Sequence, residues 1–375
     1  MVESVLLAGG GTAGHVNPML AVADELRARH PAARLTVLGT QEGLESQLVP
    51  ARGYPMAVVP RVPLPRRPGA DLFSVPRRLR AAVDAASRAI TENEAQVVVG
   101  FGGYVSTPAY LAARRLGVPV VIHEQNARPG LANKLGARWA RSVAVTFPGT
   151  PLRGGIITGL PLRHEIADLV RDREVDAARV RREAAATLGL DPGRRTLLVT
   201  GGSLGAQSLN DAMTGALDDV AASDAQVLHL TGNGKSGALE SALAQRPELA
   251  NRYHVREYLE DMHLALAACD VVLCRSGAGT VAELTALGIP AVYVPLPIGN
   301  GEQRLNALPA VHAGGGLLVD DTEVTPEWVR TQLLTLLADE DRVTQMAEAA
   351  ARVGRVGAAS DVSDMVERAA GERDE

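Results

Sequence analysis

Short apolar runs recur in the first half of the chain, and each is followed by a glycine-rich or polar stretch. They fall at residues 5–8, 35–38, 97–99 and 118–122. Runs this short predict buried strands rather than helices, which usually need about ten residues or more. After the first run, apolar residues recur at helical spacing, at Leu20, Ala23 and Leu26. Strands that alternate with helices predict an α/β fold, with a parallel sheet covered by helices on both faces.

The second half repeats this opening unit. At an offset of 191 residues, Gly10, Gly11 and Thr12 match the Gly-Gly-Ser of residues 201–203, and Gly14 matches Gly205. The repeat predicts two similar glycine-loop domains. Glycine and proline in residues 159–163 (GLPLR) interrupt regular structure, so the chain is expected to cross between the domains there.

The expected fold class is therefore α/β, with two Rossmann-like domains facing a cleft. The expected domains are residues 1–162 and 163–345, with a C-terminal helix in 346–375 that packs back on the first domain. Ligands of open α/β sheets bind at the carboxyl ends of the strands. We therefore expect the three polar loops after strands of the first half, at residues 9–18, 100–106 and 123–126, to face this cleft.

The first glycine loop has two interpretations. Gly9, Gly11 and Gly14 satisfy the G-x-G-x-x-G spacing of dinucleotide-binding loops, so a nicotinamide or flavin enzyme is an alternative. Such a site needs an acidic residue at the end of the second strand, about 20 residues on. Here that strand ends in Gly-Thr-Gln, with Glu42 late, and His15 places a titratable ring beside the loop.

Residues 271–283 predict a diphosphate site. The buried strand of residues 271–274 is followed by Arg-Ser-Gly-Ala-Gly-Thr, which opens a helix that includes Glu283. The N–H groups and positive dipole of a helix start favour phosphate. Glu283 lies about one turn after Gly279, where its carboxylate could accept the hydroxyls of a ribose. The alternative is an ordinary strand-turn-helix capped by Ser276.

Length, net charge and cysteine content exclude several classes of protein. With 375 residues the chain can form two domains with cores, and a net charge of −5 argues against a general nucleic-acid binder. Cys269 and Cys274 are too few for a disulfide framework or a metal cluster, and no metal site is expected. The chain has no apolar stretch near the ~20 residues that span a bilayer and no basic leader, so a cytoplasmic location is expected.

Basic residues gather in one segment. It contains Arg61, Arg66, Arg67, Arg77, Arg78, Arg80 and Arg88, interleaved with Leu64, Leu72, Phe73, Val75 and Leu79. A basic and partly apolar segment suits an anionic lipid surface. The alternative is a solvated helix face beside a proline-rich loop.

Six motifs occur in order and together carry a family resemblance. They are Gly-Thr-Ala-Gly-His-Val-Asn-Pro (11–18), Gly-Gly-Tyr-Val-Ser (102–106), His-Glu-Gln-Asn (123–126), Gly-Gly-Ser-Leu-Gly-Ala (201–206), Cys-Arg-Ser-Gly-Ala-Gly-Thr-Val-Ala-Glu (274–283) and Gln-x-x-Asn-Ala (303–307). Over nearly the whole chain this set resembles the MurG-type N-acetylglucosaminyltransferases of peptidoglycan synthesis, two-domain enzymes of the GT-B fold. The first loop departs from the usual pattern, because Ala13 stands where a glycine is common.

The resemblance implies the substrates. The donor is UDP-GlcNAc, and the acceptor is undecaprenyl-diphospho-MurNAc-pentapeptide. The implied donor contacts are Leu259 with uracil, Glu283 with ribose, Ser203 and Ala278, Gly279 and Thr280 with the diphosphate, Arg163 with the nucleotide, and Gln303, Thr12, Ala13, Gly14 and Asn126 with the sugar. No cofactor is implied. The implied location is peripheral, on the cytoplasmic face of the cell membrane, where cell-wall and division proteins are expected partners.

Transfer with inversion needs a base on the acceptor hydroxyl, and UDP leaves as a stable anion without a proton donor. We expect His15 to be this base, because an unperturbed imidazole has a pKa near 6.5. Glu124 and Asn126 are the alternative pair, as base and acceptor-orienting amide, and His123 is expected to be structural. Three other functions stay open: a nonhydrolysing UDP-GlcNAc epimerase, another lipid glycosyltransferase, and a non-catalytic nucleotide-sugar-binding scaffold.

Overall fold

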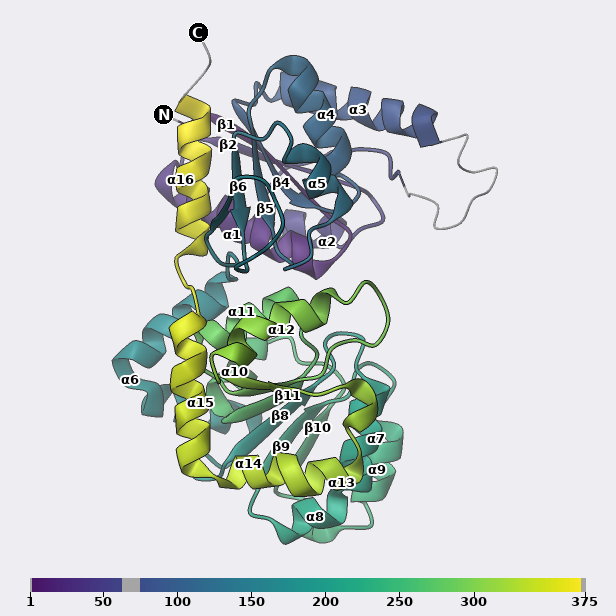
Figure 1. Ribbon diagram of the computed structural model, residues 1–375, viewed down its shortest axis with the longest axis vertical. Coiled ribbons are helices and arrows are strands. Elements are labelled where there is room, and N and C mark those ends of the chain that lie inside the picture. Colours follow the sequence, from purple (N-terminus) through teal and green to yellow (C-terminus); the bar gives the residue numbers. More distant parts are fainter. Residues whose placement is uncertain (1, 63–74, 372–375) are drawn as a thin grey trace. The chain divides into compact units, whose positions relative to one another are not determined.

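The computed structural model describes residues 2–62 and 75–371 and divides the chain into two compact units (Figure 1). The N-terminal unit comprises Met1–His164 and Arg355–Glu375. The C-terminal unit comprises Glu165–Gly354. The chain thus passes between the units twice, at residues 164–165 and 354–355.

The N-terminal unit is a seven-stranded parallel sheet in the order β3-β2-β1-β4-β5-β6-β7. Its strands are β1 (Ser4–Gly9), β2 (Arg34–Gly39), β3 (Met56–Val58), β4 (Val97–Gly102), β5 (Val120–Glu124), β6 (Ser142–Val145) and β7 (Gly155–Ile157). Its helices are α1 (Ala13–Arg29), α2 (Glu45–Ala51), α3 (Val75–Glu92), α4 (Ser106–Leu116), α5 (Leu131–Gly136) and α16 (Ala358–Gly371).

Both faces of the central strands β1, β4 and β5 are buried, which explains the uninterrupted apolar runs. Val5 and Leu7 of β1 pack in one core with residues of α1 and α16, such as Met365. Leu6 and Ala8 point to the other face and pack with residues of α3 and α4. Successive side chains of a strand point to opposite faces, so a doubly covered strand has no polar alternation.

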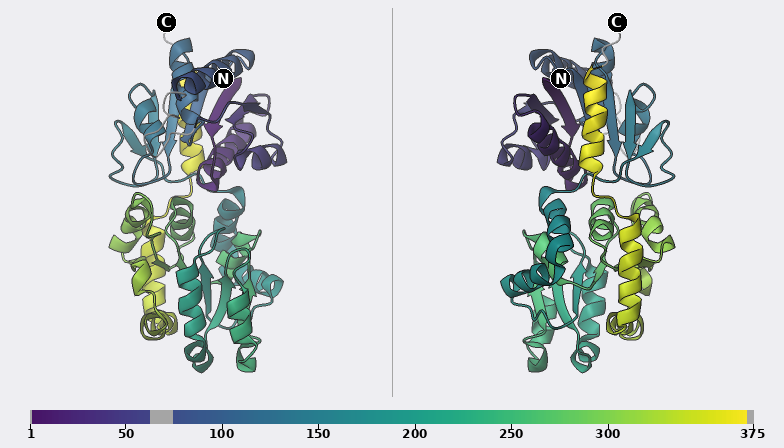
Figure 2. Two further views of the ribbon diagram at one scale, coloured as in Figure 1. Left: turned by 90° about the vertical axis from the view of Figure 1, so that its right-hand side faces the viewer. Right: turned by 90° about the vertical axis from the view of Figure 1, so that its left-hand side faces the viewer.

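The C-terminal helix α16 belongs to the N-terminal unit, where it lies beside α1 (the yellow helix of this unit in Figure 2). Arg29, at the end of α1, binds it through polar contacts. Its guanidinium donates to the carboxylate of Asp364 at 2.5 Å and to the hydroxyl of Ser360 at 2.5 Å. It also pairs with Glu367 at 3.1 Å. These contacts and the apolar core fix the chain end to the first domain.

The C-terminal unit is a six-stranded parallel sheet in the order β10-β9-β8-β11-β12-β13. Its strands are β8 (Thr196–Thr200), β9 (Gln226–Leu230), β10 (Tyr253–Arg256), β11 (Val271–Cys274), β12 (Ala291–Tyr293) and β13 (Gly316–Leu318). Its helical segments are α6 (His164–Leu188), α7 (Gln207–Gly215), α8 (Leu217–Ala222), α9 (Gly237–Leu243), η2 (Pro247–Leu249), α10 (Met262–Ala268), α11 (Ala278–Ala286), α12 (Glu302–His312), η3 (Asp321–Glu323), α13 (Pro326–Trp328), η4 (Val329–Leu333), α14 (Leu334–Ala338) and α15 (Glu340–Val353).

The two sheets share the order of six strands, and β7 is an additional edge strand of the first. The prediction of two similar doubly wound α/β domains is therefore confirmed. The glycine loops are equivalent in position. Gly11 (φ 89°) follows β1 and Gly202 (φ 80°) follows β8, both in the left-handed region that favours glycine. The loops differ in length, because α1 begins two residues after Gly11 and α7 begins five residues after Gly202.

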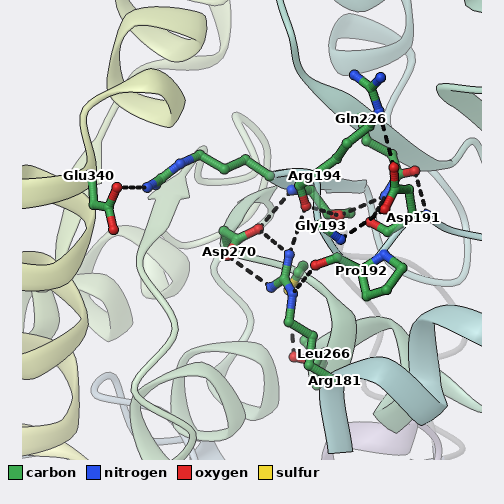
Figure 3. A network of polar contacts seen from close by, with 12 residues as sticks. Arg181, Asp191, Pro192, Gly193, Arg194, Gln226, Leu266, Asp270 and Glu340 are labelled. Atoms are coloured by element: carbon green, nitrogen blue, oxygen red, sulfur yellow. Dashed lines mark hydrogen bonds and ion pairs between the residues drawn. The ribbon is translucent and has the colours of Figure 1, made fainter. Parts of the chain in front are cut away.

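A network of hydrogen bonds connects α6 to the starts of β8 and β11 (Figure 3). Both terminal nitrogens of Arg181 donate to the carboxylate of Asp270, at 2.8 Å each, and one donates to the Arg194 carbonyl at 2.8 Å. Asp270 also accepts from the Thr196 backbone at 2.7 Å. A two-pronged contact of this kind fixes both distance and orientation.

The polar sequence 123–126 was expected to be a loop, but β5 continues through Glu124, so His123 and Glu124 are buried strand residues. Part of the basic segment, residues 63–74, lies outside the described residues. Among the residues that are described, none of the helices combines the length and the apolar character needed to cross a membrane.

Candidate active site

The first glycine loop joins β1 to α1 and brings His15 to the end of the sheet. Thr12 is the N-cap residue of α1, and its side chain makes no capping hydrogen bond. Thr12, Ala13 and Gly14 are exposed, whereas His15 in the first helical turn is partly buried. Ala13 is the first residue of the helix, so no left-handed conformation is needed there.

The His15 ring contacts the last residue of β4 and the first residue after β5. Its Nδ1 lies 2.9 Å from Oε1 of Gln125. It also lies against Gly102, where a Cβ atom would come within 3.2 Å of the His15 Cε1 atom. Three strand ends thus meet at His15, as expected for the carboxyl edge of a parallel sheet.

Glu124 organises the loop after β5. It is 1% exposed, and its carboxylate accepts hydrogen bonds from the backbone N–H groups of Asn126 and Gly130, both at 3.0 Å, and from Nδ2 of Asn133 at 2.9 Å. Both oxygens are engaged and enclosed. This arrangement favours a positioning role over proton acceptance, and it sets the backbone of Asn126 directly after the strand.

A second buried carboxylate, that of Glu45, holds the glycine loop by a hydrogen bond to its backbone. One of its oxygens accepts from the Gly11 N–H at 2.8 Å, and the other accepts from the N–H (3.0 Å) and hydroxyl (2.8 Å) of Thr40. Burial raises the pKa of Glu45, but these hydrogen bonds outweigh burial and lower the pKa below its usual value. Glu45 also borders a small pocket lined by Gly10, Gly11, Thr40, Glu42, Gly43, Arg61, Tyr104 and Val105.

Glu45 was not among the residues predicted from the sequence. Only Glu42 was considered as the acid after the second strand, at the position where a dinucleotide site would need one. The signal that could have found Glu45 is its place at the start of a helix, three residues later, where a side chain can reach back to a neighbouring loop. The Glu45 carboxylate binds the backbone N–H of Gly11, whereas the acidic residue of a dinucleotide site binds a ribose.

The second glycine loop is built on β8 and β9 of the C-terminal unit. Gly205 (φ 66°) packs so closely on β9 that a Cβ atom there would lie 2.0 Å from the Thr231 carbonyl oxygen. The Gly205 N–H donates to the Gly202 carbonyl at 2.9 Å, which closes a tight turn. Ser203 lies within this turn and is exposed.

The start of α11 is not capped by a side chain. Its N-cap residue is Gly277, in an extended conformation (φ −60°, ψ 149°), so the alternative of a cap at Ser276 is wrong. Ser276 is buried instead. The backbone N–H groups of the first turn, at residues 278–280, therefore suit an anion. Glu283 lies about one turn further along the same helix and is partly buried.

Leu259 and Gln303 lie on two other segments of the C-terminal unit, a loop and a helix start. Leu259 lies between β10 and α10 and is partly exposed. Gln303 lies in the first turn of α12, and its side-chain oxygen accepts from the Leu296 N–H at 3.0 Å. Arg163 directly precedes α6, is partly buried, and falls within the N-terminal unit.

Arg275 belongs to the motif of residues 274–283, but the sequence predicted no role for it. Its guanidinium pairs with Asp321 and donates to the Val294 carbonyl at 3.2 Å and to Ser208 at 3.2 Å. It therefore joins the loop that precedes α11 to the end of β12, to η3 and to α7. Among the described residues, no group of three or more His, Cys, Asp or Glu side chains is placed to hold a metal ion.

Two parallel sheets that share the order of six strands, each with a glycine loop after its first strand, form the GT-B fold of glycosyltransferases. The glycosyltransferase family 28 N-terminal domain matches residues 5–145, and the family 28 C-terminal domain matches residues 196–367. The chain belongs to glycosyltransferase family 28.

Individual relatives show which members of this family the chain resembles. The chain is 54% identical, over 100% of its length and 97% of the relative, to the UDP-N-acetylglucosamine--N-acetylmuramyl-(pentapeptide) pyrophosphoryl-undecaprenol N-acetylglucosamine transferase of Frankia casuarinae. It is 53% identical to the protein of the same name from Streptomyces coelicolor, over 94% of both chains. The resemblance to MurG-type enzymes is thus confirmed.

Solved structures agree with this assignment. The crystal structure of Acinetobacter baumannii MurG is 30% identical, with a TM-score of 0.77 and coverage of 98% of this chain and 99% of that one. The UDP-GlcNAc 2-epimerase of Neisseria meningitidis is 14% identical, with a TM-score of 0.70 and coverage of 97% of this chain and 100% of that one. At that identity, the epimerase shares the fold alone.

Proposed function

We propose that this chain transfers N-acetylglucosamine, with inversion, from UDP-GlcNAc to undecaprenyl-diphospho-MurNAc-pentapeptide. The observation that carries the proposal is full-length identity above 50% with transferases of that name, in a chain that retains both glycine loops. The product is the lipid-linked β-1,4 disaccharide of peptidoglycan synthesis.

In this proposal the C-terminal unit binds the donor. The uncapped start of α11, at Ala278, Gly279 and Thr280, binds the diphosphate together with Ser203, and Glu283 accepts the ribose hydroxyls. Leu259 contacts the uracil. A helix start supplies fixed N–H donors, so it needs no metal ion to receive the charge of departing UDP.

Further contacts complete the donor site. Gln303 contacts the sugar from the start of α12, and its hydrogen bond to Leu296 holds the side chain in place. Arg163 neutralises charge on the nucleotide. From the N-terminal unit, Thr12, Ala13, Gly14 and Asn126 contribute sugar contacts, for which the first three are exposed at the start of α1.

His15 is the proposed base. It takes the proton of the acceptor hydroxyl as the new glycosidic bond forms and the bond to UDP breaks. Glu124 acts through the loop that it organises, and Asn126 orients the acceptor. A base contributes roughly 10² to 10⁴ in rate, which is about 3 to 5 kcal/mol. Each preorganised donor on the leaving group contributes ~3 to 4 kcal/mol, so leaving-group stabilisation is the larger share.

The membrane is the proposed second partner. Arg77, Arg78, Arg80 and Arg88 are exposed on α3. Such a basic helix face suits the anionic cytoplasmic leaflet, where the lipid-linked acceptor would be met. The proposed location is therefore peripheral, on that face of the membrane, near other cell-wall and division proteins.

The test separates transfer from the alternatives by its dependence on acceptor. Purified protein is incubated with UDP-GlcNAc, with and without a short-chain lipid-linked MurNAc-pentapeptide, and UDP release is followed. Transfer predicts UDP release only when acceptor is present. Conversion of UDP-GlcNAc to its 2-epimer without acceptor would establish the epimerase, and donor binding without UDP release would establish the scaffold.

A further inference from the structure

A chain of hydrogen bonds runs through the N-terminal unit from a backbone carbonyl to His15. The Gly159 carbonyl oxygen lies 2.9 Å from Nε2 of His123. Nδ1 of His123 lies 3.1 Å from the side-chain nitrogen of Gln125. The side-chain oxygen of Gln125 lies 2.9 Å from Nδ1 of His15. The sequence motif supplied His123 and Gln125, but the proposed reaction assigns them no role.

The proton positions along this chain follow from its first member. A carbonyl oxygen only accepts, so Nε2 of His123 must carry a hydrogen. Burial lowers the pKa of His123 to about 4, and the Gly159 bond opposes this only in part, so the ring is neutral at pH 7. A neutral ring has one N–H. Nδ1 of His123 is therefore an acceptor.

The orientation of the Gln125 amide is determined in the same way. Its nitrogen donates to Nδ1 of His123 and, at 2.9 Å, to the His123 backbone carbonyl. If the amide were inverted, its oxygen would face two acceptors at a site that is 1% exposed, where water gives no relief. The amide oxygen must therefore point to His15, whose Nδ1 must carry a hydrogen.

From this geometry we infer that Gln125 is a positioning residue that holds neutral His15 in the Nδ1–H tautomer, which leaves the lone pair on Nε2. The inference rests on the proposed function only for its purpose, since Nε2 is the atom that would accept the acceptor's proton. A neutral amide fixes the tautomer without adding a buried charge beside the ring. His123 fixes Gln125, and the Gly159 backbone fixes His123.

The origin of this chain is itself fixed. Gly159 adopts φ 87°, and a Cβ atom there would lie 2.7 Å from Cβ of Arg355, so the site requires glycine. His123 is fully buried in β5, and its carbonyl also accepts from Asn133 at 3.2 Å. The tautomer is thus set by main-chain atoms and buried side chains, which do not rearrange with solvent.

The direct test is the tautomer itself. Protein with ¹⁵N-labelled histidine is studied by long-range ¹H–¹⁵N NMR at about pH 8, where free imidazole is neutral, and the spectrum of His15→Gln identifies the His15 signals. The inference predicts a pyrrole-type Nδ1 and a pyridine-type Nε2 in the parent protein. The reverse assignment in the parent overturns it, whether or not the protein transfers sugar.

The variant Gln125→Met keeps the side-chain length but removes the three hydrogen bonds of the amide, to Nδ1 of His15, to Nδ1 of His123 and to the His123 carbonyl. We expect the His15 signals to lose the Nδ1–H pattern and kcat for transfer to fall by about tenfold or more, while KM for UDP-GlcNAc changes by less than about threefold. Gln47→Met, at an exposed position on α2, is the matched control. An unchanged His15 spectrum or an unchanged kcat in Gln125→Met contradicts the inference.

Discussion

The buried carboxylate of Glu45 provides a sharp test of how the first glycine loop is held. In Glu45→Gln, the new amide oxygen can still accept from Thr40, but its NH₂ group then faces the Gly11 N–H, and two donors cannot bond. A hydrogen bond to a charged group contributes about 1.5 to 3 kcal/mol. We therefore expect Glu45→Gln to lower the free energy of unfolding of the N-terminal unit by ~1 to 3 kcal/mol.

Glu45→Ala should cost more. It leaves the N–H groups of Gly11 and Thr40 without their acceptor, at about 1 to 3 kcal/mol each. It also empties the space that the side chain fills, because Cβ atoms at Gly10, Gly39 and Gly43 would all meet Glu45. A loss of ~2 to 6 kcal/mol is a large share of the stability of a typical domain, which is about 5 to 15 kcal/mol.

The assay uses the two tryptophans of the chain, since Trp139 belongs to the N-terminal unit and Trp328 to the C-terminal unit. In a Trp328→Phe background, the fluorescence of Trp139 follows urea unfolding of the N-terminal unit alone. The control is Glu3→Gln, an exposed carboxylate of the same unit. We also expect kcat to fall by about tenfold or more, because a displaced loop moves His15.

The pH dependence follows from the lowered pKa of Glu45. The ionised form is favoured in the folded state, so its contribution is fully present above the ordinary pKa of 4.5 and is lost as pH falls through the folded pKa. The difference between parent and Glu45→Gln should therefore shrink in acid. Equal urea midpoints for Glu45→Gln and Glu3→Gln at neutral pH would refute this account of the loop.

Three other predictions concern the proposed donor site, the proposed membrane surface and a buried histidine. Glu283→Gln should raise KM for UDP-GlcNAc by about tenfold, as expected for the loss of one charged hydrogen bond of ~1.5 kcal/mol. An unchanged KM in initial-rate kinetics would show that Glu283 does not bind the donor. Arg77 and Arg78 changed together to Glu should weaken sedimentation with anionic vesicles and leave UDP-GlcNAc affinity intact; equal vesicle binding would exclude this surface. Burial lowers the pKa of His229 from 6.5 to about 3, so the unfolded chain binds the proton at a higher pH than the folded chain does. As pH falls from 6.5 to about 3, the free energy of unfolding should therefore fall by ~1.4 kcal/mol per pH unit. In His229→Gln, followed by Trp328 fluorescence, this slope should diminish, and an identical slope would contradict the assignment.

The sequence predicted the sheets well where strands are buried on both faces. Residues 5–8 and 97–99 stand out as apolar runs because helices cover both sides of the sheet. Strands of only three residues, such as β7 and β13, carry no periodicity and could not be found. His123 and Glu124 were taken for a loop because they are polar, yet their hydrogen bonds to Gly159 and Asn133 let them lie buried in β5.

The candidate site was predictable only as a set of loops. Motif spacing located His15, Glu283 and both glycine loops, but it could not reveal which side chains meet. Glu45 and Gln125 contact residues 34 and 110 positions away. Such contacts depend on strand order and on a few tenths of an ångström in packing, neither of which is visible in local patterns.

The central claim is most directly tested by isolating the product. The purified chain is given labelled UDP-GlcNAc and a short-chain lipid-linked MurNAc-pentapeptide, and the lipid product is characterised by mass spectrometry and by the anomeric proton coupling of the new sugar. The account predicts one added GlcNAc in β-linkage to MurNAc. A lipid that gains no label, or one that carries the sugar in α-linkage, would contradict it.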